Sequence, residues 1–311
     1  MNNKVKTAVK IVVSLGLLAL LLKISGPEKV FTTISGSNPT LFALASLLIF
    51  IGTVVAAYRW YTVMAALDFK GNFIFYIKSY FMGVFFNQLL PSSIGGDAYR
   101  VIDVSRLGYR KRDAFVGVLI DRGLGILGIF IVNIIFNNML PGLLPEAIYQ
   151  TLNAISLVGI LGFTAFVFIH KISSLNNLKF FAIVVKPSSE LCKVINTPFK
   201  LVFQLCLTTA VHMLTFAGVY FIALSIGVNL SVSTFMVIMP PVILLTIIPI
   251  SLAGWGIREG AMAGLLSFAG VSKELAISIS ILYGFTYILQ GIIGLILWIK
   301  SKGDKVKTHE S

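Results

Sequence analysis

Two ten-residue stretches, each inside an apolar segment, decide how this chain of 311 residues folds. Residues 91–100 read Pro-Ser-Ser-Ile-Gly-Gly-Asp-Ala-Tyr-Arg, and residues 249–258 read Pro-Ile-Ser-Leu-Ala-Gly-Trp-Gly-Ile-Arg. They align without a gap at a spacing of 158 residues (249 minus 91), with identical Pro, Ser, Gly and Arg. Because proline ends a helix and glycine allows a tight turn, each stretch predicts a break between two short helices.

The composition places these segments in a membrane. Hydrophobic residues make up 57% of the chain and charged residues only 12%. A soluble domain has about 45–50% apolar and about 25% charged residues. The sequence therefore excludes a cytosolic enzyme and a disordered protein, and it predicts an all-α polytopic membrane protein.

Six stretches are long enough to cross a bilayer, which takes about 20 mostly apolar residues. They are residues 8–24, 41–64, 114–137, 151–170, 201–226 and 277–299. The first stretch follows lysines but lacks a cleavage site, so we interpret it as an uncleaved span. Two further apolar segments, 73–104 and 235–270, contain the two interrupted motifs.

The basic residues predict the orientation of the chain. Lys and Arg number 25 against 12 Asp and Glu, for a net charge of +13. They gather in 104–113, in 171–200 and at both termini, whereas 138–150 and 227–234 contain none. The positive-inside rule then puts both termini in the cytoplasm of a prokaryotic cell, in its inner membrane. Since these cations follow the spans, nucleic-acid binding is not predicted.

This orientation makes the two interrupted segments re-entrant hairpins, because 73–104 begins and ends inside and 235–276 begins and ends outside. The shift of 158 residues also carries 41–64 onto 199–222 and 114–137 onto 272–295. We therefore expect one membrane domain, residues 1–311, with six full spans and two re-entrant helical hairpins in an inverted repeat. Repeat 1 covers about 8–137 and repeat 2 about 151–299. The alternative is that Gly and Ser only let the helices pack closely.

Broken segments at matching positions of an inverted repeat predict a transport site near the middle of the membrane. Each half-helix that follows a break presents its N-terminus, with Arg100 or Arg258 one turn on, and this combination favours an anion such as a phosphate head group. The predicted substrate-binding residues are Ser93, Gly95, Gly96, Asp97, Arg100, Asp121, Arg122, Ser251, Gly254, Arg258 and Glu259.

Charged residues within apolar sequence are costly and normally pair inside the protein. We expect Asp121 to pair with Arg100 or Arg258, and Arg122 to pair with Glu259. Asp97 is expected to cap its half-helix or to pair with Arg100. The alternative to a binding role is that these are permanent ion pairs that hold the repeats together.

Other polar residues carry weaker expectations. Arg59-Trp60-Tyr61 is interpreted as an anchor at the membrane interface. Residues 173–200 suit either an amphipathic interfacial helix or an ordinary connection. The cysteines and histidines lack the spacing of a metal site. We predict no metal, no cofactor and no catalytic residue.

At residues 87–100, at Asp121-Arg122 and at 254–260, the chain resembles the lysylphosphatidylglycerol synthase transmembrane family, also called flippase-like integral membrane proteins. Arg59-Trp60 resembles the family as well, and the likeness covers about residues 8–300. Asp121 stands where many family members show Glu. The resemblance implies a region that flips an aminoacylated phospholipid between leaflets. In the best-known relatives a soluble domain attaches the amino acid; the sequence ends at Ser311, soon after the last predicted span, so lysyl transfer is not expected.

The main hypothesis is therefore a flippase-like protein whose partner is an anionic phospholipid or a lipid-linked substrate. A homo-oligomer is compatible with the sequence. The second hypothesis is a membrane glycosyltransferase that uses polyprenyl-phosphate substrates. It is less favoured because the predicted outer loops offer only Glu28, Glu146 and Glu274, without a paired acidic motif. A third is a membrane scaffold without transport activity.

Overall fold

The computed structural model describes residues 16, 19–21, 23, 26–89, 95–172, 182–248, 251 and 253–307, and this part of the chain contains helices and no strand. The helices are α2 (Pro27–Ser35), α3 (Pro39–Ala66), α4 (Phe73–Leu89), α5 (Gly95–Ser105), α6 (Lys111–Met139), α7 (Glu146–Phe168), the 3-10 helix η1 (Ile169–Lys171), α9 (Ala182–Val194), α10 (Pro198–Ser225), α11 (Val232–Ile247), α12 (Ile257–Ser267) and α13 (Lys273–Lys307).

Among the described residues, α3, α6, α7, α10 and α13 are long and apolar enough to cross a membrane. They coincide with five of the six predicted spans, so the prediction of a multi-pass membrane protein is confirmed. Most of the predicted first span, 8–24, lies outside the described residues. The count of six spans therefore stays a prediction.

Local signals explain where two of the long helices begin. The Asn38 side chain accepts hydrogen bonds from the backbone N–H groups of Thr40 (3.0 Å) and Leu41 (3.1 Å) at the start of α3. Thr197 caps α10 in the same way through Lys200 N–H, at 3.2 Å. A proline follows each cap, at the first helical position, where its missing N–H costs nothing.

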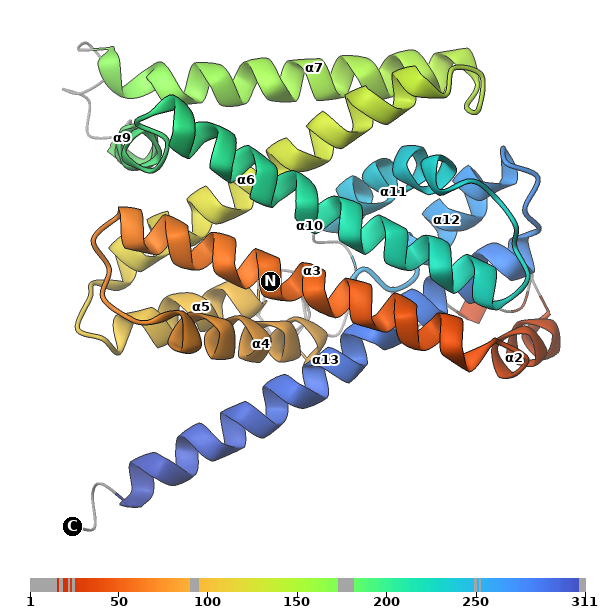
Figure 1. Ribbon diagram of the computed structural model, residues 1–311, viewed down its shortest axis with the longest axis horizontal. Helices are drawn as coiled ribbons and strands as arrows, with labels where there is room; N and C mark the ends of the chain where they lie inside the picture. Colours follow the sequence, from red (N-terminus) through yellow and green to blue (C-terminus); the bar gives the residue numbers. More distant parts are fainter. Residues whose placement is uncertain are drawn as a thin grey trace.

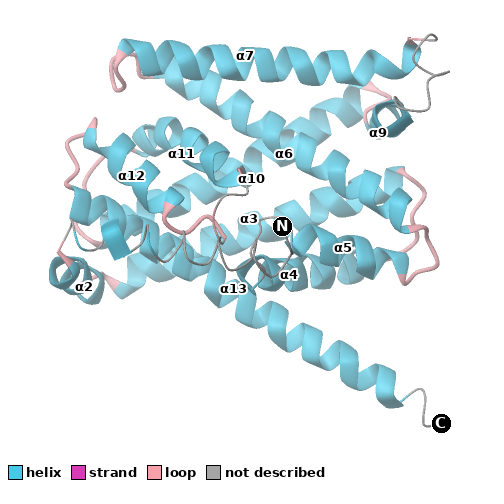
Figure 2. Cartoon of the chain, turned by 180° about the vertical axis from the view of Figure 1, so that it is seen from behind, coloured by secondary structure: helices cyan, strands magenta, loops and turns pink. Residues whose placement is uncertain are grey.

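The helices form two series that match in order and length. Adding 158 to the bounds of α3 and α4 gives 197–224 and 231–247, which agree with α10 and α11 within one residue. The packing also corresponds, since α4 packs against α13 and α11 packs against α6. In Figure 1, α3 and α10 run side by side through the centre, and the hairpins α4–α5 and α11–α12 lie toward opposite ends. Figure 2 shows the same arrangement from behind.

Basic loops lie at one end of this arrangement. The loops 67–72 and 106–110 and helix α9 lie on the left in Figure 1 and contain Lys70, Arg106, Arg110, Lys186 and Lys193. The loops at the other end, 36–38, 140–145, 226–231 and 268–272, contain neither Lys nor Arg. We call the first the basic end. The charge separation expected from the sequence is therefore present in these loops, while helix α2 at the other end contains Lys29.

The segment after α7 is helical and packed where it is described. Leu191 and Val194 of α9 are each 1% exposed and pack with Val63, Ile120 and Leu124 of α3 and α6. Residues 173–181 lie outside the described part. Helix α9 thus contributes to the interior of the protein, and an interaction of this segment with anionic lipid stays a prediction.

Candidate functional site

A cavity of about 370 Å³ lies at the centre of the fold, with walls from both hairpins and from α3, α6, α10 and α13. This volume falls in the range of small-molecule pockets, about 300–1,000 Å³. Six aspartate and arginine side chains line it: Arg59, Asp97, Arg100, Asp121, Arg122 and Arg258. Uncharged polar residues complete the wall, among them Asn87, Gln88, His212, Thr246, Tyr283 and Tyr287.

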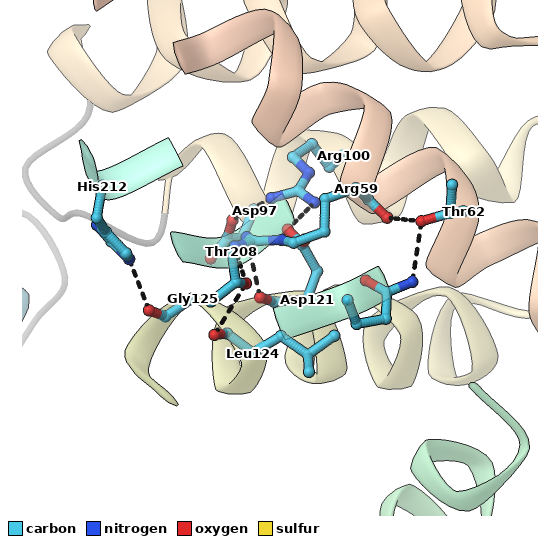
Figure 3. A network of polar contacts seen from close by, with 10 residues as sticks. Arg59, Thr62, Asp97, Arg100, Asp121, Leu124, Gly125, Thr208 and His212 are labelled. Atoms are coloured by element: carbon cyan, nitrogen blue, oxygen red, sulfur yellow. Dashed lines mark hydrogen bonds and ion pairs between the residues drawn. The ribbon is translucent and has the colours of Figure 1, made fainter. Parts of the chain in front are cut away.

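Five of the charged residues form one chain of ion pairs. Arg59 Nε donates to Asp121 Oδ1 at 2.9 Å, and Arg100 Nη2 donates to Asp121 Oδ2 at 2.6 Å. Arg100 Nη1 also donates to Asp97 Oδ1 at 3.2 Å, and Asp97 Oδ2 pairs with Arg122. Figure 3 shows Arg59 and Arg100 converging on Asp121. Because three arginines share two carboxylates, this chain carries a net positive charge.

Asp121 is the most deeply buried member of the chain, with 1% of its surface exposed. A carboxylate buried this deeply without a partner would destabilise the fold by on the order of several kcal/mol. Two arginine donors offset that cost. The Arg100 guanidinium also lies over the rings of Trp60, 4.0 Å from the centroid, and Tyr80, at 4.7 Å, which adds cation–π attraction.

The interpretation of Arg59 as an interfacial anchor is wrong. Its side chain is 5% exposed and donates to Thr208 Oγ1 at 2.8 Å and to the Asp121 carbonyl at 3.1 Å. Side chains on a helix point back toward its N-terminus, so the guanidinium lies deeper than the Arg59 Cα near the end of α3. Arg59 packs close to Gly125 of α6, where a Cβ would lie in van der Waals contact with Arg59 Nη2 at 3.4 Å.

The second hairpin holds Arg258 in a separate cluster. Arg258 Nη2 donates to Glu259 Oε1 at 2.9 Å, and Arg258 Nε donates to Ser280 Oγ at 3.0 Å. Ser280 Oγ in turn donates to Glu259 Oε1 at 2.8 Å. The rings of Trp255 and Tyr283 lie 4.7 and 5.4 Å from the guanidinium.

This cluster corrects two expected ion pairs. Glu259 does not pair with Arg122, because its carboxylate turns back and accepts the Gly256 N–H at 2.5 Å, which caps α12. Arg122 pairs with Asp97 instead. Of the two partners expected for Asp121, Arg100 is confirmed, while Arg258 binds Glu259 and Ser280. The expected pair of Asp97 with Arg100 is also confirmed.

At the start of each half-helix, one backbone N–H group that was expected to bind an anion is already bound by a side chain. The Gly96 N–H of α5 donates to Asn87 Oδ1 at 2.7 Å, and the Gly256 N–H is held by Glu259. Side chains of the protein therefore already satisfy these donors, and the arginines supply the positive charge of the cavity.

The remaining predicted residues are placed as follows. Gly96 lines the cavity, whereas Gly95, Ser251, Gly254 and Glu259 do not line it. Gly95, Ser251 and Glu259 are buried, and Gly254 has a positive φ of 82° that favours glycine. Ser93 lies outside the described residues.

Gly96 is required by a close approach of α5 to α4. A Cβ at this position would lie 2.3 Å from the Gly83 carbonyl oxygen, a backbone atom that cannot rotate away. We expect Gly96→Ala to destabilise the protein by about 1–3 kcal/mol, as overpacking does. The measurement is the apparent Tm in detergent. Gly264→Ala is the control, because nothing lies within 4 Å of its Cβ. Equal Tm values for both variants would disprove the close contact.

No group of three or more His, Cys, Asp or Glu in the described residues is placed to hold a metal ion. His212 belongs to the cavity wall, and its Nε2 lies 2.8 Å from the Gly125 carbonyl oxygen. Cys192 and Cys206 are free thiols.

The comparison with known families decides the classification, because the family described as "Lysylphosphatidylglycerol synthase TM region" matches residues 7–294. The chain belongs to this family. It is also similar to a UPF0104 membrane protein of Pyrococcus horikoshii, with 24% identity over 94% of this chain and 96% of that protein. A UPF0104 membrane protein of Methanocaldococcus jannaschii is 27% identical over 38% of this chain and 35% of its own length.

The ion-pair chain lies wholly within the region shared with the lysylphosphatidylglycerol synthase TM family. Sequence reasoning placed four of its five members at the site and missed Arg59. It also missed Asn87, Thr208 and the aromatic residues around the arginines. The sequence did contain a signal for Arg59. Helical side chains point toward the N-terminus, so an arginine in the last two turns of a span directs its guanidinium group back into the membrane.

Proposed function

We propose that the protein binds the head group of an anionic phospholipid or lipid-linked substrate in the central cavity and moves it between the leaflets. The supporting observation is the charge of the cavity: its lining has four arginines against two aspartates, and Glu259 behind the lining neutralises Arg258, which leaves one positive charge in excess. A cleft with excess positive charge attracts anions, and guanidinium groups bind phosphate through paired hydrogen bonds. Charged residues at membrane depth usually mark such a pathway.

Arg122 is the arginine best placed to meet a head group first. Its side chain is 30% exposed, whereas those of Arg59, Arg100 and Arg258 are 5–7% exposed. A phosphate that displaces Asp97 from Arg122 does not strand the carboxylate, because Asp97 also accepts from Arg100. The exchange therefore replaces one anion by another and keeps the buried charges paired.

We further propose that α4–α5 and α11–α12 are re-entrant hairpins of an inverted repeat and that residues 8–24 form a sixth span. The matching helix bounds and the corresponding packing of α4 with α13 and α11 with α6 support this arrangement. The basic end then faces the cytoplasm, with both termini, by the positive-inside rule. The similarity to archaeal membrane proteins supports a location in the membrane of a prokaryotic cell. Alternating movement of the two hairpins would open the cavity to each leaflet in turn.

Blocking the cavity tests the proposal. Thr246 of α11 lines the cavity, and its hydroxyl donates to Ile243 O at 2.7 Å. Thr246→Cys, in a background with Cys192→Ser and Cys206→Ser, offers one thiol for an anionic methanethiosulfonate reagent. We expect modification to abolish transfer of fluorescent phosphatidylglycerol between the leaflets of reconstituted vesicles.

The matched control is Ser267→Cys in the same background. Ser267 is exposed on α12, outside the cavity lining, and its hydroxyl also donates to the carbonyl three residues earlier, at 2.6 Å. Modified Ser267→Cys protein should keep its transfer rate. If fully modified Thr246→Cys protein, verified by mass, keeps its rate too, the cavity is not the pathway.

A further inference from the structure

A second hollow, of about 270 Å³, lies between α6 and α7 and has no charged residue in its wall. Leu127 and Phe130 of α6 face Phe163 and Phe166 of α7 across it. Gly162 of α7 faces open space, since nothing lies within 4 Å of a Cβ built on it, whereas Gly159 lets the Phe130 ring pack against α7. We call this hollow the α6–α7 groove. Its lining suits an apolar occupant.

The groove adjoins the charged cavity. Ile126 lines both, and Gly123 in the groove wall directly follows Arg122 in the cavity wall. One occupant can therefore have an anionic part at Arg122 and an apolar part between α6 and α7. A lipid has this combination of groups, whereas a free phosphate has only the first.

The position of α7 points to the bilayer as the source of the occupant. Helix α7 lies at the edge of the protein in Figures 1 and 2, and Ser156 is its one buried residue. Phe285 and Ile288 of α13 stand at the positions matching Leu127 and Phe130 of α6 (285 and 288 minus 158), and both are exposed in the described part of the chain. Because α7 is an apolar candidate span with one buried residue, the groove lies beside a face suited to hydrocarbon.

We propose that the α6–α7 groove binds one hydrocarbon chain of the lipid whose phosphate is held at Arg122. This inference rests on the proposed function. From Gly123 to Phe130 the groove follows seven residues of α6, or about 10 Å at 1.5 Å per residue. Burial of methylene groups along this length adds chain-dependent affinity to the charge-dependent affinity of the cavity. The groove therefore selects lipids over soluble phosphate esters with the same head group.

Gly162→Leu tests the groove because it fills the groove without touching the cavity. The new side chain enters open space, so we expect normal folding. Gly264→Leu is the matched control, since Gly264 is also an exposed helical glycine with nothing within 4 Å of its Cβ and lies outside both hollows.

Two ligands that share a head group distinguish binding of the acyl chain from binding of the phosphate. The first is long-chain phosphatidylglycerol, and the second is a short-chain phosphatidylglycerol that is soluble as a monomer. We expect Gly162→Leu to weaken binding of the long-chain lipid about tenfold and to leave the short-chain affinity unchanged. Gly264→Leu should change neither. A diazirine near the end of one acyl chain should label peptides of α6 and α7 in the wild-type protein and not in Gly162→Leu.

The outcomes distinguish the two proposals. If the wild-type protein binds both ligands and Gly162→Leu leaves the long-chain affinity unchanged, or if the diazirine labels other helices, the groove does not hold the chain and head-group binding still stands. If the wild-type protein binds neither ligand, the proposed function fails and the groove inference fails with it. Loss of labelling by competition with a second membrane protein would mean that a protein segment occupies the groove.

Discussion

Asp121→Asn is expected to leave little folded protein, because it removes the carboxylate that Arg59 and Arg100 share. Asparagine keeps the shape of the side chain but not its charge, so two buried guanidinium groups lose their partner. Breaking a buried ion pair from one side typically costs about 3–5 kcal/mol. The measurement is the apparent Tm and the monodisperse fraction on size-exclusion chromatography in detergent.

Asp103→Asn, on the neighbouring helix α5, provides the matched control. The Asp103 side chain is 9% exposed, but its partner Arg106, at 3.0 Å, is 45% exposed, so the substitution leaves no buried cation without a partner. We expect this loss to cost about 1 kcal/mol. Adding Arg59→Met to Asp121→Asn should restore part of the stability, because it removes one unpaired charge. Equal Tm values for Asp121→Asn and Asp103→Asn would mean that the ion-pair chain does not hold α3, α5 and α6 together.

Arg122→Gln is expected to weaken head-group binding strongly and to leave the fold intact. Its partner Asp97 keeps its bond to Arg100, so no buried carboxylate is stranded. A hydrogen bond to a charged group contributes about 1.5–3 kcal/mol, so we expect phosphatidylglycerol binding to weaken about 10- to 100-fold. Native mass spectrometry of the detergent-solubilised protein with added phosphatidylglycerol measures this affinity.

The control is Arg106→Gln, which removes an equal charge at the basic end and outside the cavity lining. It should retain the wild-type affinity, while its Tm should fall because the buried Asp103 carboxylate loses its partner. Unchanged lipid binding in Arg122→Gln would show that Arg122 pairs with Asp97 for structural reasons alone. That result would favour the reading of these charges as permanent ion pairs.

Much of the fold could be predicted because membrane spans depend on one-dimensional signals. Apolar length predicted α3, α6, α7, α10 and α13, and the Pro-Gly motifs predicted the breaks between the paired short helices. For residues 173–200 the two alternatives were an interfacial helix and an ordinary connection, and the packing of α9 into the protein was not predicted, because Leu191 and Val194 look the same in sequence whether they face lipid or protein.

The site could be predicted less well because pairing depends on geometry between distant segments. Arg100 and Asp121 were paired correctly, since charges in apolar sequence must find each other. Arg122 was predicted to pair with Glu259 and pairs with Asp97 instead. Glu259 caps α12, and the spacing of residues alone does not show whether a carboxylate caps a helix or forms an ion pair. Arg59 was missed because the position of its Cα near a helix end concealed the depth of its guanidinium group.

The central claim is that this arginine-lined cavity carries an anionic head group across the membrane. Its most direct test is the rate at which fluorescent phosphatidylglycerol changes leaflets in vesicles that contain the wild-type protein, Arg122→Gln or Arg106→Gln. We predict that the wild-type protein and Arg106→Gln accelerate the exchange over protein-free vesicles and that folded Arg122→Gln does not. A wild-type rate equal to that of protein-free vesicles for every anionic lipid tested, or an equal rate for Arg122→Gln and the wild-type protein, would contradict the claim.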